Sequence, residues 1–453
     1  MSPEGWAEIA TGLVRGNPTS KRDERAGQRF TVRHEHFGSL IFDHVSNDYI
    51  PFDQEATAIF DLAEREPISN FAARLHSEVD RASLERFGEL CKQIGLVDGW
   101  GRFNGTFLEP SDLTEGVLSA PVRVHLALTN ACNFRCNHCF SSSGSPYPDE
   151  LTTFEVKQLI SELATQGSYQ MTFGGGEPLV RRDLPTLLEH AAKHRVAIEI
   201  STNAVAAAPE VVDSLRGLPV ARFNVSLDGG SAETYDAIRG ERGAFTQALQ
   251  GICNLKELGA PISLRRVNMR RNAHDLDVFL RLAESLGVEE VVVTEVRKVG
   301  RAIVHPEVLL ERASINELWR QASAASYGSS VKISAPQQVP GKRVSLFSGL
   351  GCKCGQLVCH VDARGVVSPS GLLKDILPAG SLRERSFREI WLDGAGFRSM
   401  RGLPGNETCA GCLHFSGCRG GCRASVVLAG HEMNSPHADC TIAYLITREA
   451  QLV

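Results

Sequence analysis

Hydrophobic residues between positions 121 and 300 follow two alternating patterns. Short runs rich in aliphatic and β-branched residues are separated by longer segments whose apolar residues recur every three or four positions, as on one face of a helix. This alternation predicts an α/β fold in which parallel strands curl into a partial (β/α)6 barrel. The expected strands are 122–128, 170–173, 197–201, 221–227, 261–266 and 290–294. Catalytic groups of such barrels lie at the carboxyl ends of the strands, so chemistry is expected there.

Residues 28–110, ahead of the barrel at 121–300, show a different pattern. The expected elements are short strands at 30–32, 39–43 and 49–52 and amphipathic helices at 54–64 and 81–94. Three strands followed by helices resemble the winged-helix-like domain that binds the leader of a precursor peptide, which adds to the sheet as an extra strand. The alternative is a structural cap on the barrel. Residues 1–27 are polar and charged and are expected to form a flexible arm.

Composition narrows the class of protein. The chain has 453 residues and a formal net charge of −5, which suggests several domains and argues against a nucleic-acid partner. It shows no apolar run of about 18 residues and no signal-like start. We therefore expect a cytoplasmic location and no membrane partner. Thirteen cysteines in such a chain indicate metal binding or catalysis, because structural disulfides do not persist in the cytoplasm. Cys91 and Cys253 stand apart from the clusters and are expected to be small buried residues.

Three cysteines lie directly after the first expected barrel strand. Cys132, Cys136 and Cys139 are separated by three and two residues. Three thiolates on one loop can hold three irons of a [4Fe–4S] cluster, which normally takes four cysteine ligands, and leave the fourth iron open. An open iron can chelate the amino and carboxylate groups of S-adenosylmethionine (SAM). The spacing resembles the signature of radical SAM enzymes, and the alternative is a zinc site with His138 as its fourth ligand.

The resemblance also implies which residues contact SAM, at the ends of the strands that follow. In the family, the run that matches Gly175, Gly176, Glu177 and Pro178 contacts the SAM amino group, with the glutamate accepting a hydrogen bond. Further candidates are Ser201 and Ser226 for the ribose or methionine part, Arg239 and Arg265 for the carboxylate, and Phe134 for adenine. Taken alone, a serine at a strand end is more often a turn residue, and Phe134 is nearly as well explained as a core aromatic. No general acid or base is recognisable, so the catalytic residues stay unknown.

Residues 346–453 form a second cysteine-rich segment, which a bridging region at 301–345 joins to the barrel. The spacing of its last five cysteines resembles the SPASM domain, which usually carries two auxiliary [4Fe–4S] clusters. The resemblance places Cys409, Cys412, Cys418 and Cys440 on the distal cluster and Cys422 on the proximal cluster. A zinc ribbon is the alternative, but the gaps of five and three residues do not favour it.

The proximal cluster is where the chain departs from the SPASM pattern. Cys352 and Cys359 occupy the first two expected positions, but Ser370 stands at the third, and an extra cysteine, Cys354, lies between the first two. A hydroxyl is a poor iron ligand beside thiolates. Three alternatives follow: Cys354 supplies the missing thiolate, one iron stays open to substrate, or the cluster is absent or smaller. We expect a proximal cluster on Cys352, Cys359 and Cys422 with non-standard ligation of its fourth iron.

Taken together, residues 121–440 resemble radical SAM/SPASM maturases of ribosomally made peptides. The likeness is greatest to mycofactocin maturases, in residues 136–144 and 174–178 and in the last cysteines. It implies an enzyme that forms a 5′-deoxyadenosyl radical and modifies a precursor peptide by a carbon–carbon or thioether crosslink or by oxidative decarboxylation. Its partners would be that peptide with its leader and an electron donor of the flavodoxin or ferredoxin type. Alternatives are a maturase of a folded protein, an enzyme acting on a small molecule, and a zinc-ribbon scaffold without redox chemistry.

Overall fold

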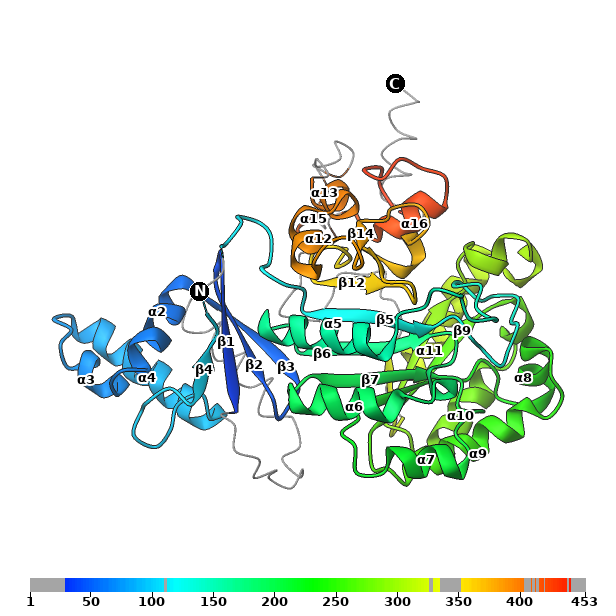
Figure 1. Cartoon of the computed structure of the whole chain (residues 1–453), viewed down its shortest axis with the longest axis horizontal. Coiled ribbons are helices and arrows are strands. Elements are labelled where there is room, and N and C mark those ends of the chain that lie inside the picture. Colours follow the sequence, from blue (N-terminus) through cyan, green and yellow to red (C-terminus); the bar gives the residue numbers. More distant parts are fainter. Residues whose placement is uncertain are drawn as a thin grey trace. The chain divides into compact units, whose positions relative to one another are not determined.

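The computed structural model describes residues 29–109, 112–325, 329–334, 352–402, 409, 412, 415–418, 420–437 and 440. The chain divides into two compact units, coloured along the sequence in Figure 1. The first unit holds the described residues up to Ala120 together with Leu163–Tyr169, and the second holds Pro121–Glu162 and the described residues from Gln170 onward. The predicted arm at 1–27 and the last part of the predicted bridging region lie outside the described residues.

The first unit contains a small mixed sheet. Its described strands have the order β3-β2-β1-β4, in which β1, β2 and β3 form an antiparallel meander and β4 pairs with β1 in parallel. The elements are β1 (Phe30–Glu35), β2 (Gly38–Asp43), β3 (Asp48–Asp53), α2 (Gln54–Ala63), α3 (Ile68–Ala72), α4 (Glu78–Ile94) and β4 (Gly105–Phe107). The strands and helices expected in this segment are present, and α3 and β4 are additional.

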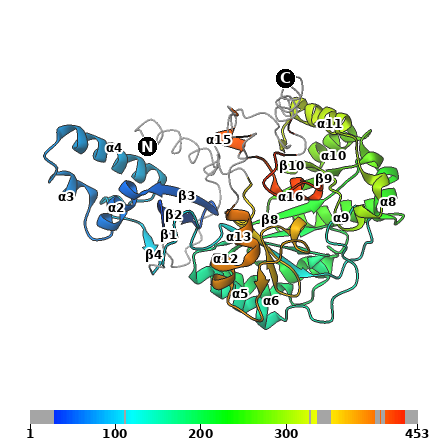
Figure 2. The ribbon, with the colours of Figure 1, turned by 90° about the horizontal axis from the view of Figure 1, so that it is seen from above.

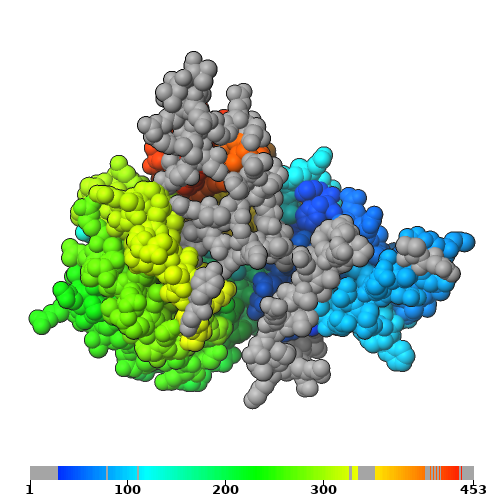
Figure 3. All heavy atoms as spheres, turned by 180° about the vertical axis from the view of Figure 1, so that it is seen from behind, coloured from blue at the N-terminus to red at the C-terminus, as the bar shows by residue number. Residues whose placement is uncertain are grey.

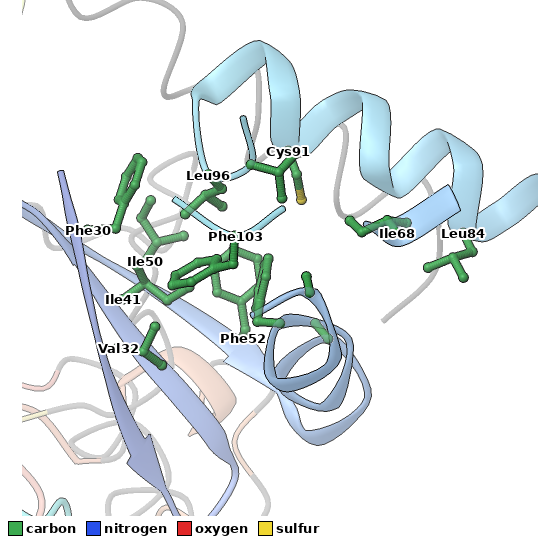
Figure 4. Packing of buried hydrophobic residues seen from close by; sticks show 14 of the residues in the cluster. Phe30, Val32, Ile41, Ile50, Phe52, Ile68, Leu84, Cys91, Leu96 and Phe103 are labelled. Carbon is green, nitrogen blue, oxygen red and sulfur yellow. The ribbon is translucent and has the colours of Figure 1, made fainter. Parts of the chain in front are cut away.

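The core of the first unit lies between the sheet and its helices. Asp53 ends β3 and caps α2, because its side chain accepts a hydrogen bond from Ala56 N, so the strand and the helix are joined without a loop. Figure 4 shows the buried cluster, to which the sheet contributes Val32 and α4 contributes Cys91. Cys91 is therefore a buried core residue, as expected. Cys253, in the second unit, is exposed, so the expectation that it is buried was wrong.

The second unit is built around a long open sheet. Among the described residues its strand order is β11-β10-β9-β8-β7-β6-β5-β12-β13-β14. The barrel strands, each parallel to its barrel neighbours, are β5 (Arg123–Thr129), β6 (Gln170–Gly175), β7 (Ala197–Thr202), β8 (Arg222–Ser226), β9 (Ile262–Asn268) and β10 (Glu290–Glu295). β11 (Lys332–Ser334) extends the sheet beyond β10 and β12 (Val358–Val361) extends it beyond β5, so the described sheet does not close on itself. The predicted partial (β/α)6 barrel is confirmed.

Helices cover the outer face of the barrel, as the ribbon in Figure 2 shows from above. Figure 3 shows the surface of this part of the chain from behind, in green to yellow. The helices are α5 (Thr153–Thr165), α6 (Leu184–Lys193), α7 (Pro209–Leu215), α8 (Ala232–Arg239), α9 (Ala244–Lys256), α10 (Leu276–Leu286) and α11 (Arg312–Ala325). Side chains alternate along the strands: Val124 and Leu126 on β5 are buried, whereas Arg123 lies on the opposite face and donates to Gln170 and Glu199. The inner face of the barrel is therefore polar. No described helix is long and apolar enough to cross a membrane.

The chain returns to the barrel sheet through β12, which pairs in parallel with β5. β13 (Val366–Ser368) and β14 (Gly380–Ser381) continue the sheet in antiparallel pairs. The helices that follow are α12 (Phe387–Asp393), α13 (Ala395–Arg401), α15 (Phe415–Cys418) and α16 (Arg423–Leu428). Phe387, Trp391 and Phe397 are fully buried between α12, α13 and their neighbours. Backbone hydrogen bonds between β12 and β5 therefore fix this segment beside the barrel.

Candidate active site

A cavity of about 670 Å³ opens at the carboxyl ends of the barrel strands. Its walls come from residues at the ends of several barrel strands and from the segment around β12 and β13. It brings together the predicted residues Cys132, Phe134, Cys136, Cys139, Gly175, Gly176, Ser201, Ser226 and Arg239, and also Cys354, Cys359 and Ser370. Residues far apart in the sequence thus converge on the edge where a barrel fold places chemistry.

The loop that carries the first three cysteines is anchored at its base. Glu150 accepts hydrogen bonds from Thr129 Oγ1 at 2.8 Å and from Asn130 N at 2.6 Å, where β5 ends. Cys132 N donates to Gly144 O at 2.9 Å, and Gly144 N donates to Asn130 O at 2.7 Å. These bonds close the loop between residues 130 and 144, so its thiols project from a fixed backbone.

Arg239, predicted to pair with the SAM carboxylate, lies in a buried network against the cysteine loop. Its Nη1 donates to Cys136 Sγ at 3.2 Å and its Nη2 donates to Asp228 Oδ2 at 2.9 Å. His138 Nε2 lies 3.4 Å from the same Asp228 oxygen. Burial alone would raise the pKa of the Asp228 carboxyl, but the Arg239 charge and the His138 hydrogen bond lower that pKa to about 2. Asp228 is therefore ionised at neutral pH and holds the Arg239 guanidinium beside Cys136.

The glycine run after β6 lies against the start of the cysteine loop. Gly175 has a φ of +111°, and a Cβ added at Gly176 would stand 2.0 Å from Ala131 O. Only glycine allows this close approach of the two backbones. Ser201 lies near the end of β7 and Ser226 ends β8, and both line the same cavity. The structure therefore brings these four predicted residues together.

Glu177, predicted to accept a hydrogen bond from the SAM amino group, is fully buried and has protein partners. It accepts from Leu179 N at 3.0 Å, from Thr202 Oγ1 at 2.7 Å and from Asn203 N at 2.7 Å. Its carboxylate thus joins the end of β6 to the end of β7, and Pro178 begins a short 3₁₀ helix at Pro178–Val180. Within the described residues, neither Glu177 nor Pro178 lines the cavity. Their contact with SAM stays a prediction.

Arg265, the other predicted carboxylate partner, lies on the inner face of the barrel. Its Nε and Nη2 donate to Asn224 Oδ1 at 3.1 Å and 2.6 Å. Burial lowers the pKa of this guanidinium, although the nearby Glu290 and Glu199 charges oppose that effect. Arg265 is not among the described residues that line the cavity, and its contact with SAM also stays a prediction.

Sequence reasoning missed Arg301, which follows β10 and holds the cysteine loop from the other side. Its Nε donates to Cys136 O and its Nη1 donates to Ser143 O, both at 2.8 Å, and its backbone N donates to Cys139 O at 3.1 Å. Gly300 has a φ of +59°, and a Cβ there would meet Cys139 O at 2.4 Å. No local sequence signal marks this contact, because it joins residues more than 150 positions apart.

Two histidines that sequence reasoning also missed line the cavity. His125 on β5 and His360 on β12 are direct neighbours in the sheet register. Burial lowers the pKa of each imidazole to about 4, and the Arg123 charge acts in the same direction on His125. Both rings are therefore neutral at neutral pH. Only the pairing of β5 with β12 reveals them as a pair.

The predicted auxiliary ligands fall into two groups. The first is Cys352, Cys354, Cys359 and Cys422, and the second is Cys409, Cys412, Cys418 and Cys440. In the part of the chain that the structure describes, no three cysteine, histidine or carboxylate side chains are arranged around one metal ion. A [4Fe–4S] cluster does not need such an arrangement, because each thiolate binds a different iron.

The cavity fits a [4Fe–4S] cluster with SAM. Three thiols from one short loop are the soft ligands that iron–sulfur clusters take. The glycine backbone at 174–176 leaves room for a ligand to approach closely. The volume lies within the usual range of small-molecule sites, about 300–1,000 Å³.

Comparison with known proteins decides the family. The pattern of the Radical SAM superfamily matches residues 126–283. Over 331 residues the chain is 34% identical to the mycofactocin maturase MftC of Mycobacterium tuberculosis (strain CDC 1551 / Oshkosh), in a match covering 71% of this chain and 83% of that protein. The chain belongs to the radical SAM superfamily. It is therefore an enzyme that uses a [4Fe–4S] cluster and SAM, which confirms the predicted cofactors and shows that the zinc-scaffold alternative is wrong.

This radical SAM enzyme is also similar to another relative and to a solved structure. It is 31% identical to the AdoMet-dependent heme synthase of Methanosarcina barkeri, over 69% of this chain and 93% of that protein. Its fold matches Streptococcus suis SuiB bound to the precursor peptide SuiA with a TM-score of 0.70 and 15% sequence identity, over 92% of this chain and 99% of that chain. The second likeness confirms the fold along most of the chain, including the part ahead of the barrel.

Proposed function

We propose that this radical SAM enzyme modifies a ribosomally made precursor peptide. The observation that carries the proposal is the 34% identity to a mycofactocin maturase over 83% of that protein. The fold likeness to SuiB, whose structure holds its precursor peptide SuiA, supports it. The modification is a carbon–carbon or thioether crosslink or an oxidative decarboxylation.

In this proposal the catalytic cluster is held by Cys132, Cys136 and Cys139. When bound, the cluster and SAM supply a 5′-deoxyadenosyl radical that takes a hydrogen atom from the substrate. The chain's own residues keep the three thiols in place: Arg239 donates to Cys136 Sγ, and Arg301 donates to the loop backbone. The residues assigned to SAM contact are the predicted ones that line the cavity, namely Phe134, Gly175, Gly176, Ser201, Ser226 and Arg239.

The first unit is proposed to bind the leader of the peptide. β3 is an edge strand of the described sheet, and an extended peptide can add to that edge as a further strand. A groove of about 740 Å³ lies on the helices that follow β3. Its apolar lining includes Ile59, Leu62, Phe87 and Leu90, and its polar lining includes the acidic Glu55 and Glu89. A leader with an apolar face and basic neighbours would match this groove.

The cysteines of residues 352–440 are proposed to carry the auxiliary clusters. Cys409 and its neighbours Cys412, Cys418 and Cys440 would hold the distal cluster. The group with Cys352 and Cys422 would hold the proximal one. Because the modification removes hydrogen from the peptide, such clusters would carry electrons away from the substrate. A flavodoxin or ferredoxin would supply the electron that starts the reaction.

A small-molecule substrate is the second candidate, because the chain is also 31% identical to an AdoMet-dependent heme synthase. Dependence of turnover on the groove of the first unit distinguishes a peptide substrate from a small-molecule substrate. A leader-dependent enzyme needs the groove for turnover of its peptide, whereas an enzyme that acts on a small molecule does not.

The test uses the full chain, reconstituted without oxygen and supplied with SAM, dithionite and each short peptide encoded beside its gene. We expect one peptide to accelerate 5′-deoxyadenosine formation and to lose two hydrogens, with or without carbon dioxide, by mass spectrometry. Leu62→Glu, in the groove, should abolish modification of that peptide while SAM cleavage without peptide continues. Val45→Glu, at a position that is 61% exposed and outside the groove lining, should behave like the unchanged enzyme. Turnover that is unaffected by Leu62→Glu would contradict leader binding in the groove.

A further inference from the structure

Cys354 lies beside the other cysteines of the first group and beside the serine that replaces an expected cysteine. Together with Cys352 and Cys422, it packs against one small hydrophobic core. Together with Cys359 and Ser370, it lines the active-site cavity. Within this group of four cysteines, Cys354 is the one that belongs to both sets of neighbours.

The backbone holds Cys354 in this position. Gly355 N donates to Val358 O at 2.8 Å. Cys354 and Val358, the first residue of β12, also form an isolated parallel β-bridge through their backbones. Gly355 has a φ of +75°, and a Cβ there would lie 3.2 Å from Pro369 Cβ. The turn that carries Cys354 therefore packs directly against the residue before Ser370.

Ser370 has a structural role that needs no metal. Its hydroxyl accepts a hydrogen bond from Leu372 N at 3.3 Å and so caps the 3₁₀ helix at Gly371–Leu373. The backbone carbonyl of Ser370 accepts a second hydrogen bond, from Ser368 Oγ at 3.2 Å. The Ser370 side chain therefore caps a helix at the position where a cluster ligand was expected.

We propose that Cys352, Cys354, Cys359 and Cys422 are the four ligands of the proximal auxiliary cluster, with Cys354 at the corner expected for Ser370. Iron in such clusters prefers thiolate to hydroxyl, and Cys354 lines the same cavity as Ser370, on a turn that packs against Pro369. The inference rests on the proposed auxiliary clusters and deepens that proposal. A cube with four thiolates has no open iron, so this cluster transfers electrons and does not bind substrate, although Cys354 and Cys359 line the active-site cavity.

Ligand swaps test the assignment without a peptide. The full chain and its variants are reconstituted without oxygen, and iron content and Mössbauer spectra are recorded. Cys354→Ala should lose about four irons or show one iron site with altered ligation, from the four-iron stoichiometry of such clusters. Adding Ser370→Cys to Cys354→Ala should restore the original iron content and spectrum. Ser370→Ala and the matched control Cys253→Ala, at an exposed cysteine, should leave both unchanged.

Other iron contents or spectra would overturn the assignment. If Ser370→Ala removes the cluster, the serine is a ligand. If Cys354→Ala matches the unchanged chain, Cys354 is not a ligand. If Ser370→Cys rescues Cys352→Ala but not Cys354→Ala, Cys352 holds the corner. An unchanged chain with only about four irons lacks auxiliary clusters altogether, and that result removes this inference together with that part of the proposed function. Failure to modify any peptide, with the predicted spectra, contradicts the proposed substrate and leaves the ligand assignment intact.

Discussion

Arg301 donates a hydrogen bond from its Nε to the carbonyl oxygen of Cys136 at 2.8 Å. A second bond, from its Nη1 to Ser143 O, has the same length. One guanidinium thus spans the loop that carries the three cysteines, while Arg239 reaches the Cys136 thiol from α8. The segment after the last barrel strand therefore helps to hold the loop that follows the first strand.

Replacing Arg301 with glutamine should loosen the catalytic cluster. Hydrogen bonds from a charged donor contribute about 1.5–3 kcal/mol each, and glutamine cannot span both carbonyls. We expect iron to be lost to a chelator several-fold faster and the electron paramagnetic resonance lines of the reduced catalytic cluster to broaden. Arg320→Gln, at an exposed arginine paired with Glu317, is the control and should have no effect. Equal rates of iron loss in the two variants would show that Arg301 does not hold the loop.

Gly176→Ala should disturb the contact between the glycine run and the cysteine loop. The new Cβ would stand 2.0 Å from Ala131 O, so one backbone must move. We expect weaker binding of SAM, measured by equilibrium dialysis on the reconstituted protein, and lower iron retention. Gly99→Ala, where a Cβ would meet nothing within 4 Å, should bind SAM as the unchanged chain does. A normal SAM affinity in Gly176→Ala would contradict the close approach.

Asp228→Asn should destabilise the fold around the cysteine loop. The substitution leaves the Arg239 guanidinium buried without its counter-charge, a change that typically costs about 3–5 kcal/mol. The free energy of unfolding in urea should fall by that amount. Asp213→Asn removes an exposed partner of Arg216 and should cost less than about 1 kcal/mol. Equal losses in the free energy of unfolding would show that the buried ion pair stabilises the fold no more than the exposed pair does.

His125 should make stability depend on pH in a defined window. Its pKa is about 4 in the folded chain and 6.5 in an unfolded one, so between these values the unfolded state binds the extra proton. The free energy of unfolding should therefore fall as the pH drops from 6.5 to about 4, with a slope of at most about 1.4 kcal/mol per pH unit from this group. His125→Gln should flatten the slope in urea unfolding of the metal-free chain. An unchanged slope would contradict burial of a neutral imidazole there.

Local sequence predicted the barrel and several of the residues that line its cavity, for physical reasons. Parallel strands buried beneath helices leave a strong hydrophobic pattern, and their carboxyl ends must meet at one edge. That rule alone is enough to bring Ser201 and Ser226 to the same cavity as Cys132. The glycines at 175 and 176 were predicted from the family resemblance as a place where the backbone approaches a ligand, and the structure shows that Gly176 also approaches the backbone at Ala131.

The sequence did not predict contacts between residues that lie far apart along the chain. Arg301 meets Cys136 only because the barrel curves, and His360 meets His125 only because β12 joins β5. Glu177 lies in the run that resembles a SAM contact, but its carboxylate accepts hydrogen bonds from Thr202 Oγ1 and Asn203 N. A motif identifies a residue type, whereas its partners depend on the packing of the whole unit.

The most direct test of this account is the iron, sulfide and zinc content of the anaerobically reconstituted chain, compared with a variant in which Cys132, Cys136 and Cys139 are all alanine. Three four-iron clusters predict about twelve irons per chain, falling by about four in the variant. The variant should also lose all reductive cleavage of SAM. Iron content unchanged by the three substitutions, or zinc in place of iron, would contradict the assignment of the catalytic cluster to these cysteines.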